Sequence, residues 1–289
     1  MATTQHRTQR YIPELDGIRG LALLMIFTNH YAGFSGNGTV IAYLSGATKS
    51  LWCGVDLFFV LSGFLITGIL LDARGTGNYF TKFYARRSLR IFPLYFAVLG
   101  FTFFILPSLI AMTSDSDRRL IANQGWLWTY TTNFETMVNG RNTAFKGDSV
   151  WLYHLWSLAI EEQFYLIWPF VIAFVPLHRI RLICWACFII CPLVRVTLGF
   201  TSLPTLAAYE ATFARLDSLT LGSLLALFVR VSLGASKPAT YGRFKTSQAS
   251  GSFLNTITDS VLVVLLYFSR RLPGSVSYTH LTLPTIYSV

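Results

Sequence analysis

Long apolar runs, separated by short polar segments, occupy most of the chain between residues 15 and 268. A helix needs roughly 20 apolar residues to cross the hydrocarbon core of a bilayer. Runs close to this length predict candidate spans at residues 15–34, 55–71, 91–112, 155–177, 182–200, 216–231 and 253–268. Because the last two runs are short, six to seven spans are expected. The predicted fold class is therefore all-α, a polytopic bundle of transmembrane helices.

The composition agrees with a membrane protein. Of the 289 residues, 53% are hydrophobic and only 12% are charged, which is about half the charged share of a typical soluble domain. These proportions exclude a disordered chain, a fibrous protein and a nucleic-acid-binding domain, although Lys and Arg outnumber Asp and Glu by 23 to 13. The lipid bilayer is the expected partner, and no nucleic acid is expected.

The excess of basic residues bears on topology, because Lys and Arg accumulate in the cytoplasmic loops of membrane proteins. With the N-terminus in the cytoplasm, thirteen Lys and Arg residues fall in inner loops and five in outer loops. We therefore expect a multi-pass protein with a cytoplasmic N-terminus. Residues 113–150 then form a long external loop, and residues 232–252 form a cytoplasmic one.

Two ionisable side chains lie on one face of the first expected span. Arg19 and His30 are 11 residues apart, which places them about 20° apart around a helix and about 16 Å apart along it. A histidine exchanges a proton near neutral pH and suits a general base that activates a hydroxyl. Two alternatives stay open: a packing or interfacial role for His30, and a pair between Arg19 and Asp16 at helix spacing.

The fourth expected span carries a polar stripe. Its members share one helix face: His154, Ser157 and Glu161. Glu162 points about 100° away from Glu161, so the two carboxylates are not expected to face one site, and the stripe favours Glu161. A carboxylate at this position can orient and stabilise the imidazole of His30. The alternative is an ion pair between Glu161 and an arginine such as Arg19 or Arg215.

A basic cluster precedes the third expected span. Arg86, Arg87 and Arg90 are spaced so that two guanidinium groups can converge on one helix face. Guanidinium groups bind phosphate in bidentate fashion. The alternative is plain anchoring at the cytoplasmic surface.

Three of the four cysteines share one helix face in an apolar run: Cys184, Cys187 and Cys191. Buried thiols of this kind usually pack as small apolar groups. No metal site is therefore expected.

Five segments together resemble the membrane acyltransferase-3 family: ELDGIRGLALLMIFTNH, GVDLFFVLSGFLIT, RRSLRIFPLYF, HLWSLAIEEQFYLIWP and FARLDSLTLGSLLA. The specific combination is an arginine, a histidine 11 residues later, an R-x-x-R, and then a carboxylate in an S-L-x-x-E-x-x-F-Y setting. The resemblance extends from about residue 11 to residue 227.

The resemblance implies an O-acyltransferase of the bacterial cytoplasmic (inner) membrane. Such an enzyme moves an acyl group, acetyl by default, from acyl-CoA (acetyl-CoA) to a hydroxyl of a sugar or a cell-envelope glycan. The alternative is a membrane transporter or channel that uses the intramembrane charges.

The resemblance also implies roles for the residues of the motifs. His30 is the expected catalytic base or acyl relay, with Glu161 and Arg19 as its catalytic neighbours. The residues expected to contact the phosphates of coenzyme A are Arg87, Arg90 and Arg86.

The end of the chain departs from this pattern. Residues 276–285 read VSYTHLTLPT, which resembles a translated sequencing adapter. We therefore expect residues 1–275 to be a truncated acyltransferase domain and residues 276–289 to be a non-native tail.

Overall fold

A computed structural model describes residues 13–31, 45–48, 50–109, 114–139, 150–200 and 209–232. These residues belong to one compact unit, Tyr11–Ala239. They form helices joined by short turns and contain no strand. The expected all-α class is confirmed.

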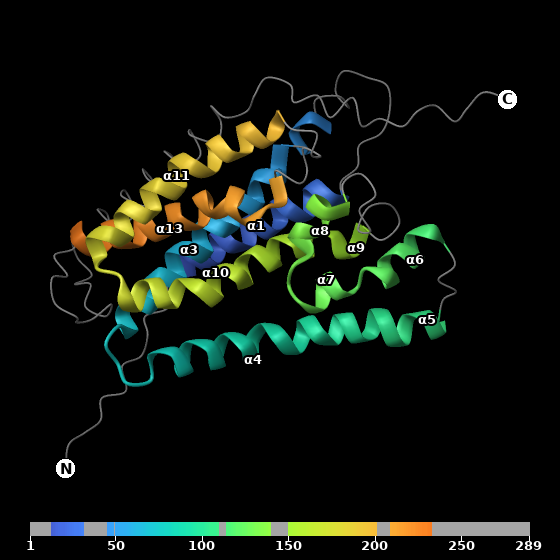
Figure 1. The fold of residues 1–289 in the computed structure, drawn as a ribbon, viewed down its shortest axis with the longest axis horizontal. Helices are drawn as coiled ribbons and strands as arrows, with labels where there is room; N and C mark the ends of the chain where they lie inside the picture. Colours follow the sequence, from blue (N-terminus) through green and yellow to red (C-terminus); the bar gives the residue numbers. More distant parts are fainter. Residues whose placement is uncertain are drawn as a thin grey trace, which may run out of the picture. The chain divides into compact units, whose positions relative to one another are not determined.

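The long helices run roughly along a common direction (Figure 1). Their bounds are α1 (Pro13–Tyr31), α3 (Gly54–Ala73), α4 (Tyr79–Gly100), α10 (Leu155–Phe174), α11 (Leu177–Gly199) and α13 (Thr212–Ser232). The shorter elements are η1 (Leu51–Cys53), the π-helical η2 (Phe101–Ile105), α5 (Leu106–Leu109), α6 (Asp115–Ala122), α7 (Gly125–Trp128), α8 (Thr132–Asn139) and α9 (Val150–Tyr153).

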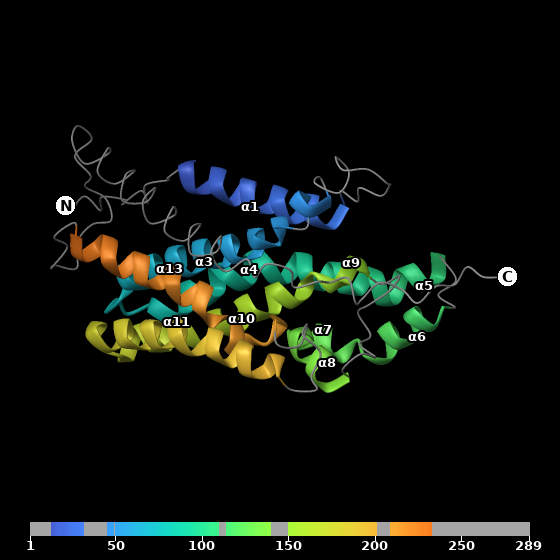
Figure 2. The ribbon, with the colours of Figure 1, turned by 90° about the horizontal axis from the view of Figure 1, so that it is seen from above.

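Helix α3 lies at the centre of the described unit. Helices α1, α10 and α13 pack against it, and α11 packs against the far side of α13 (Figures 1 and 2). Helix α4 lies at the edge, where it continues through η2 into α5. The short helices α6 to α9 gather at one end of the long helices, beside the end of α5 (Figure 1).

Two glycines permit the close approach of α3 and α13. A Cβ atom added to Gly63 would overlap the carbonyl oxygen of Leu219, and one added to Gly222 would overlap that of Val60. In a bilayer the hydrophobic effect does not drive helices together, so small residues that let backbones approach have a large effect on packing.

A chain of hydrogen bonds joins three helices next to this contact. The indole Nε1 of Trp168 donates to Thr67 Oγ1 at 2.8 Å, Thr67 donates to Ser223 Oγ at 2.8 Å, and Ser223 donates to the Leu219 carbonyl at 3.1 Å. Each of these three side chains thus has a hydrogen-bond partner, and the bonds hold α10, α3 and α13 in register.

In the described part of the chain, five helical stretches are long and apolar enough to cross a membrane. They are Ser45–Ala73, Tyr79–Leu109, Leu155–Phe174, Leu177–Gly199 and Thr212–Arg230. The first expected span forms helix α1, which is not among the five. The expected seventh span, the loop 232–252 beyond its first residue and the tail 276–289 lie outside the described residues. The count of six to seven spans stays a prediction.

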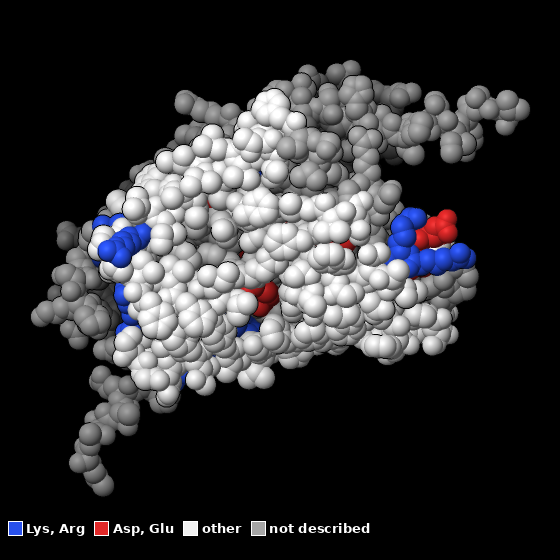
Figure 3. Space-filling view, in the orientation of Figure 1, with Lys and Arg blue, Asp and Glu red and all other residues white. Residues whose placement is uncertain are grey.

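The distribution of charge over the surface is consistent with a bilayer environment. On the face shown in Figure 3, charges gather over α6 at one end and near the start of α11 at the other, and most of the described surface between them is uncharged. One spot between α10 and α4 is an exception, because acidic and basic atoms appear there together. An intramembrane charge is costly and marks a candidate site.

Helix α4 begins earlier than the sequence predicts. The expected span starts at residue 91, whereas the helix starts at Tyr79. Its first turns are amphipathic: Tyr79 and Phe83 are buried, while Lys82 and Arg86 are exposed. A search for continuous apolar runs misses such a segment, and the arginine cluster consequently lies inside the helix rather than before it.

The expected external loop 113–150 contains three short helices, α6, α7 and α8. Helix α6 begins with a capping box, in which Asp117 N–H donates to Ser114 Oγ and Ser114 N–H donates to Asp117 Oδ2, both at 3.1 Å. Local capping therefore stabilises a short helix in this segment, which the pattern of apolar runs does not predict.

Candidate active site

Three consecutive polar residues of α10, Glu161, Glu162 and Gln163, face three different neighbours. Glu161 is 5% exposed and lies beside the hydroxyls of Ser62 and Tyr165. Its Oε1 atom is buried without a hydrogen-bond partner. A buried carboxylate oxygen that lacks a partner costs free energy, so Oε1 is available to a ligand or a reacting group.

Arg87 of α4 lies close to both glutamates of α10. Its guanidinium carbon is 3.8 Å from the ring centroid of Tyr165, and the arginine is near enough to act electrostatically on Glu161 and on Glu162. The sequence predicts that the two carboxylates do not share a site. Arg87 lies within electrostatic range of both carboxylates, although they point about 100° apart around α10 and, among the described residues, neither forms an ion pair with Arg87 within 4.0 Å.

Arg19 of α1 also acts electrostatically on Glu161. It pairs with Asp16, with 3.9 Å between Nη1 and Oδ1, as the helix spacing allows. Its Nε is buried without a partner. Within the described residues, no ion pair shorter than 4.0 Å joins Glu161 to an arginine, and Arg215 pairs with Asp56 instead, at 2.9 Å.

His30 lies in the last turn of α1, and its side chain is outside the described residues. Along the helix axis it is about 16 Å from Arg19. Glu161 lies near the Arg19 end of this interval. Contact between Glu161 and the imidazole therefore stays a prediction.

The three clustered arginines differ in their surroundings. Arg86 and Arg90 are exposed, whereas Arg87 is half-buried and turned toward α10. The structure thus separates one inward-facing arginine from two that are open to an incoming anion.

Glu162 faces a second group of side chains, on the α4 side of α10. It acts electrostatically on Tyr95 and Tyr130 as well as on Arg87. Its Oε1 and the hydroxyl of Tyr130 are both buried without a partner. Burial, with Tyr95 and Glu162 nearby, raises the pKa of Tyr130, so its phenol stays protonated and can donate a hydrogen bond.

The backbone of Tyr130 is in the left-handed region, with φ of 54°, which is uncommon for a bulky side chain. Its ring stacks on Tyr95 with 4.1 Å between centroids. Gln163 Nε2 donates to the Tyr130 carbonyl at 2.8 Å and to Asn133 Oδ1 at 2.9 Å, and Thr212 donates to Gln163 Oε1. These contacts hold the turn between α7 and α8 against α10.

A separate set of buried charges joins α3, α11 and α13. Asp56 accepts hydrogen bonds from Ser218 and pairs with Arg215, each at 2.9 Å, and Arg195 donates to Asp217 Oδ1 at 3.1 Å. The guanidinium of Arg215 lies 4.1 Å from the centroid of the Tyr209 ring. Because the charges largely neutralise one another, we interpret this set as structural.

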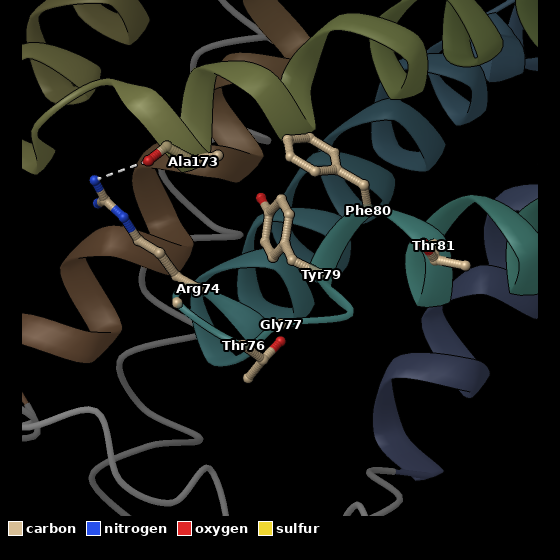
Figure 4. Close-up of a pocket in the computed structure, with 8 residues that line it drawn as sticks. Arg74, Thr76, Gly77, Tyr79, Phe80, Thr81 and Ala173 are labelled. Carbon is tan, nitrogen blue, oxygen red and sulfur yellow. Dashed lines mark hydrogen bonds between the residues drawn. The ribbon is translucent and has the colours of Figure 1, made fainter.

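A shallow pocket of about 400 Å³ lies where α3 ends and α4 begins (Figure 4). Its lining includes Arg74, Tyr79, Phe80 and Ala173. The Arg74 guanidinium points toward α10 and donates to the carbonyls of Ala173, at 3.5 Å, and Val175, at 3.0 Å. This arginine therefore caps the C-terminal end of α10.

In the part of the chain that the structure describes, no three His, Cys, Asp or Glu residues come together as a metal site. Cys184 and Cys191 are buried and free, and Cys187 is half-buried and free.

The comparison with known families decides the family of this chain. A family model described as an acyltransferase domain matches residues 12–233. The chain belongs to the acyltransferase-3 family. The resemblance inferred from the motifs is confirmed, and the match includes every helix described above.

Curated relatives of this acyltransferase-3 chain are bacterial. "O-acetyltransferase OatA" of Staphylococcus aureus is 34% identical over 229 residues, covering 75% of this chain and 34% of the relative. "Putative peptidoglycan O-acetyltransferase YrhL" of Bacillus subtilis is 37% identical over 175 residues, covering 57% and 24%. This chain thus spans about a third of the length of the first relative. No solved structure matches it.

Several residues of this acyltransferase-3 site were missed by the reasoning from sequence. Tyr130 lies in a segment without a charged motif, so no spacing pointed to it. Tyr95 lies within the segment RRSLRIFPLYF, where the arginines were the stronger signal. Gln163 directly follows the two glutamates, and its position in the EEQ sequence was the available signal. Outside the site, Arg195 was missed because its partner, Asp217, lies on another helix.

Proposed function

We propose that this chain is the membrane domain of an enzyme that transfers an acetyl group to a hydroxyl of a cell-envelope glycan, with peptidoglycan as the leading acceptor. The family match over residues 12–233 carries the reaction class, and the names of the relatives support O-acetylation. This family assignment favours an enzyme over the transporter or channel alternative.

The proposed donor is acetyl-CoA, which approaches from the cytoplasm. Arg86 and Arg90 are exposed on α4 and can take its phosphates, since guanidinium groups bind phosphate well. Arg87 would act deeper, near Glu161 and Glu162. The proposed orientation, with the N-terminus in the cytoplasm of a bacterium and the chain in its inner membrane, places the exposed arginines on the donor side.

His30 is the proposed catalytic base. It would take the proton of the acceptor hydroxyl while the hydroxyl oxygen attacks the acetyl carbonyl and the donor sulfur leaves as a thiolate. In the relay variant the imidazole itself carries the acetyl group before the acceptor takes it. Glu161 is proposed to stabilise the protonated imidazole, and Arg19 to line the path between Arg87 and His30. The buried, unpartnered Oε1 of Glu161 supports its role.

The test uses membranes that contain the protein, labelled acetyl-CoA and a soluble peptidoglycan fragment. His30→Ala is expected to lower transfer by at least about 100-fold, because general base catalysis contributes about 10²- to 10⁴-fold. Membrane insertion should be unchanged. Leu24→Ala, at an exposed leucine of the same helix, is the control and should retain transfer. Normal transfer by His30→Ala would remove the histidine from the mechanism, and label retained on the wild-type chain would favour the relay.

A further inference from the structure

Polar atoms without partners come together on the α4 side of α10. They belong to Arg87 (Nε), Glu162 (Oε1) and Tyr130 (the hydroxyl), and all three are buried. Glu162 acts electrostatically on Tyr130, and Arg87 acts on Glu162. Leaving such groups unpaired costs free energy, and three of them on residues linked electrostatically through Glu162 indicate a site built to bind something polar.

The strained turn supports this interpretation independently. Tyr130 has a left-handed backbone although it is neither glycine nor asparagine. Gln163 and the stack on Tyr95 hold it there. Backbone strain that the surroundings maintain concentrates at functional sites. In this conformation the tyrosine hydroxyl is buried, within electrostatic range of Glu162.

The composition of the site is that of a ligand site, with a few polar groups among aromatic rings. Phe92 and Phe96 lie 5.7 and 6.1 Å from the Tyr130 ring, and Trp128 stacks on Phe96 at 5.9 Å. The helices that carry Glu162 and Arg87 flank the spot in Figure 3 where acidic and basic atoms appear together on an otherwise uncharged face.

The charges of the site indicate which substrate it suits. The carboxylate of Glu162, with that of Glu161 on the adjacent face of α10, repels the phosphates of an acyl-CoA donor, and Arg87 is the one group of the site that attracts them. A sugar hydroxyl is different, because it donates one hydrogen bond and accepts others. It can donate to Glu162 and accept from Tyr130 or Arg87. Tyr130 also lies between α7 and α8, and its ring is 5.7 Å from that of Phe92, two residues after Arg90 on α4, so an acceptor held here would adjoin the proposed donor site.

We propose that Glu162, Tyr130 and Arg87 form the subsite that binds the hydroxyl-bearing sugar unit of the acceptor. This inference rests on the proposed function. Glu162 receives a hydrogen bond from the sugar, Tyr130 donates one to it, and the aromatic rings around Tyr130 cover its apolar face.

The test is steady-state transfer from acetyl-CoA to a soluble peptidoglycan disaccharide, with the KM of each substrate measured separately. Tyr130→Phe keeps the ring and removes only the hydroxyl, so the acceptor KM should rise roughly 3- to 10-fold. Glu162→Gln should raise it roughly 10- to 100-fold, because a bond to a charged group is lost. The KM for acetyl-CoA should stay within about 2-fold in both variants.

Tyr84→Phe is the matched control. Its hydroxyl donates to the Leu166 carbonyl at 2.8 Å on the same two helices, but it does not face the subsite, so the acceptor KM should not change. An unchanged acceptor KM in both test variants, or an equal rise in the KM for acetyl-CoA, would overturn the subsite while leaving the proposed function standing.

Binding of the disaccharide without donor, followed by tryptophan fluorescence, separates the subsite from the reaction. Binding that Glu162→Gln weakens, in a protein that transfers no acetyl group, would refute the proposed function and support the subsite. Absence of binding to the unmodified protein would overturn the subsite.

Discussion

Buried charges in this bundle fall into two kinds at the scale of single residues. Asp56 and Arg215 form an ion pair at 2.9 Å, with side chains that are 1% and 4% exposed, although Asp56 Oδ2 and Arg215 Nε and Nη2 keep no partner of their own. Glu161 is about as buried, but among the described residues it forms no ion pair within 4.0 Å, and its Oε1 has no partner. Removing one member of a buried ion pair destabilises the fold, whereas a buried charge outside such a pair remains available for binding or proton transfer.

Breaking the paired set should destabilise the protein. Arg215→Ala leaves the Asp56 carboxylate buried and uncompensated, which is expected to cost about 3–5 kcal/mol of unfolding free energy. Thermal unfolding in detergent measures this effect. Arg118→Ala removes an exposed arginine, 4.0 Å from Asp115, and should change nothing measurable. Equal stability of the two variants would contradict a structural role for Arg215.

At the scale of helices, the close packing of α3 against α13 depends on two glycines, which have no side chains. Gly63 and Gly222 lie where each helix meets a carbonyl of the other. The hydrogen bonds through Thr67 and Ser223 require the same close approach. Both polar motif residues of α3, Asp56 and Ser62, are positioned by this packing, so the contact connects fold stability to the candidate site.

Gly222→Ala is expected to push α3 and α13 apart and to lower the free energy of unfolding by about 1–3 kcal/mol, the range for overpacked cores. The midpoint of unfolding in a denaturing detergent series measures the loss. Gly100→Ala on α4 is the matched control, since a Cβ there meets nothing within 4 Å. A destabilisation as large in the control would show that loss of helix contact is not the cause.

At the scale of the whole molecule, the face of the described unit shown in Figure 3 is largely uncharged between two charged ends. One end carries α6 to α9, and the other carries the turns that join α3 to α4 and α10 to α11. The second end includes four basic residues in or next to those turns: Arg74, Lys82, Arg179 and Arg181. By the distribution of basic residues we expect it to face the cytoplasm.

Cysteine labelling with a membrane-impermeant maleimide tests this orientation. Arg118→Cys on α6 should label in intact cells, whereas Lys82→Cys at the start of α4 should label only after permeabilisation; both positions are exposed. The unmodified chain, with its four cysteines, gives the background. The reverse pattern would invert the proposed topology and place the donor side outside.

Much of the architecture was predictable from the sequence, because burial in lipid demands continuous apolar helices. The predicted spans 55–71, 155–177, 182–200 and 216–231 correspond to α3, α10, α11 and α13 with shifts of a few residues. The early start of α4 was not predictable from apolar runs, since its first turns bury only one face.

What the sequence alone determined is the all-α membrane class, the family and the positions of Arg19 and Glu161 on separate helices. These follow from periodicity and local motifs, which depend on neighbours along the chain. Only the tertiary structure decided that Arg87 lies within α4, in electrostatic range of both Glu161 and Glu162, and that Tyr130 lies in range of Glu162. Those interactions connect α4, α10 and the turn after α7. They depend on how the helices pack in space, and residue spacing within one helix does not encode that packing.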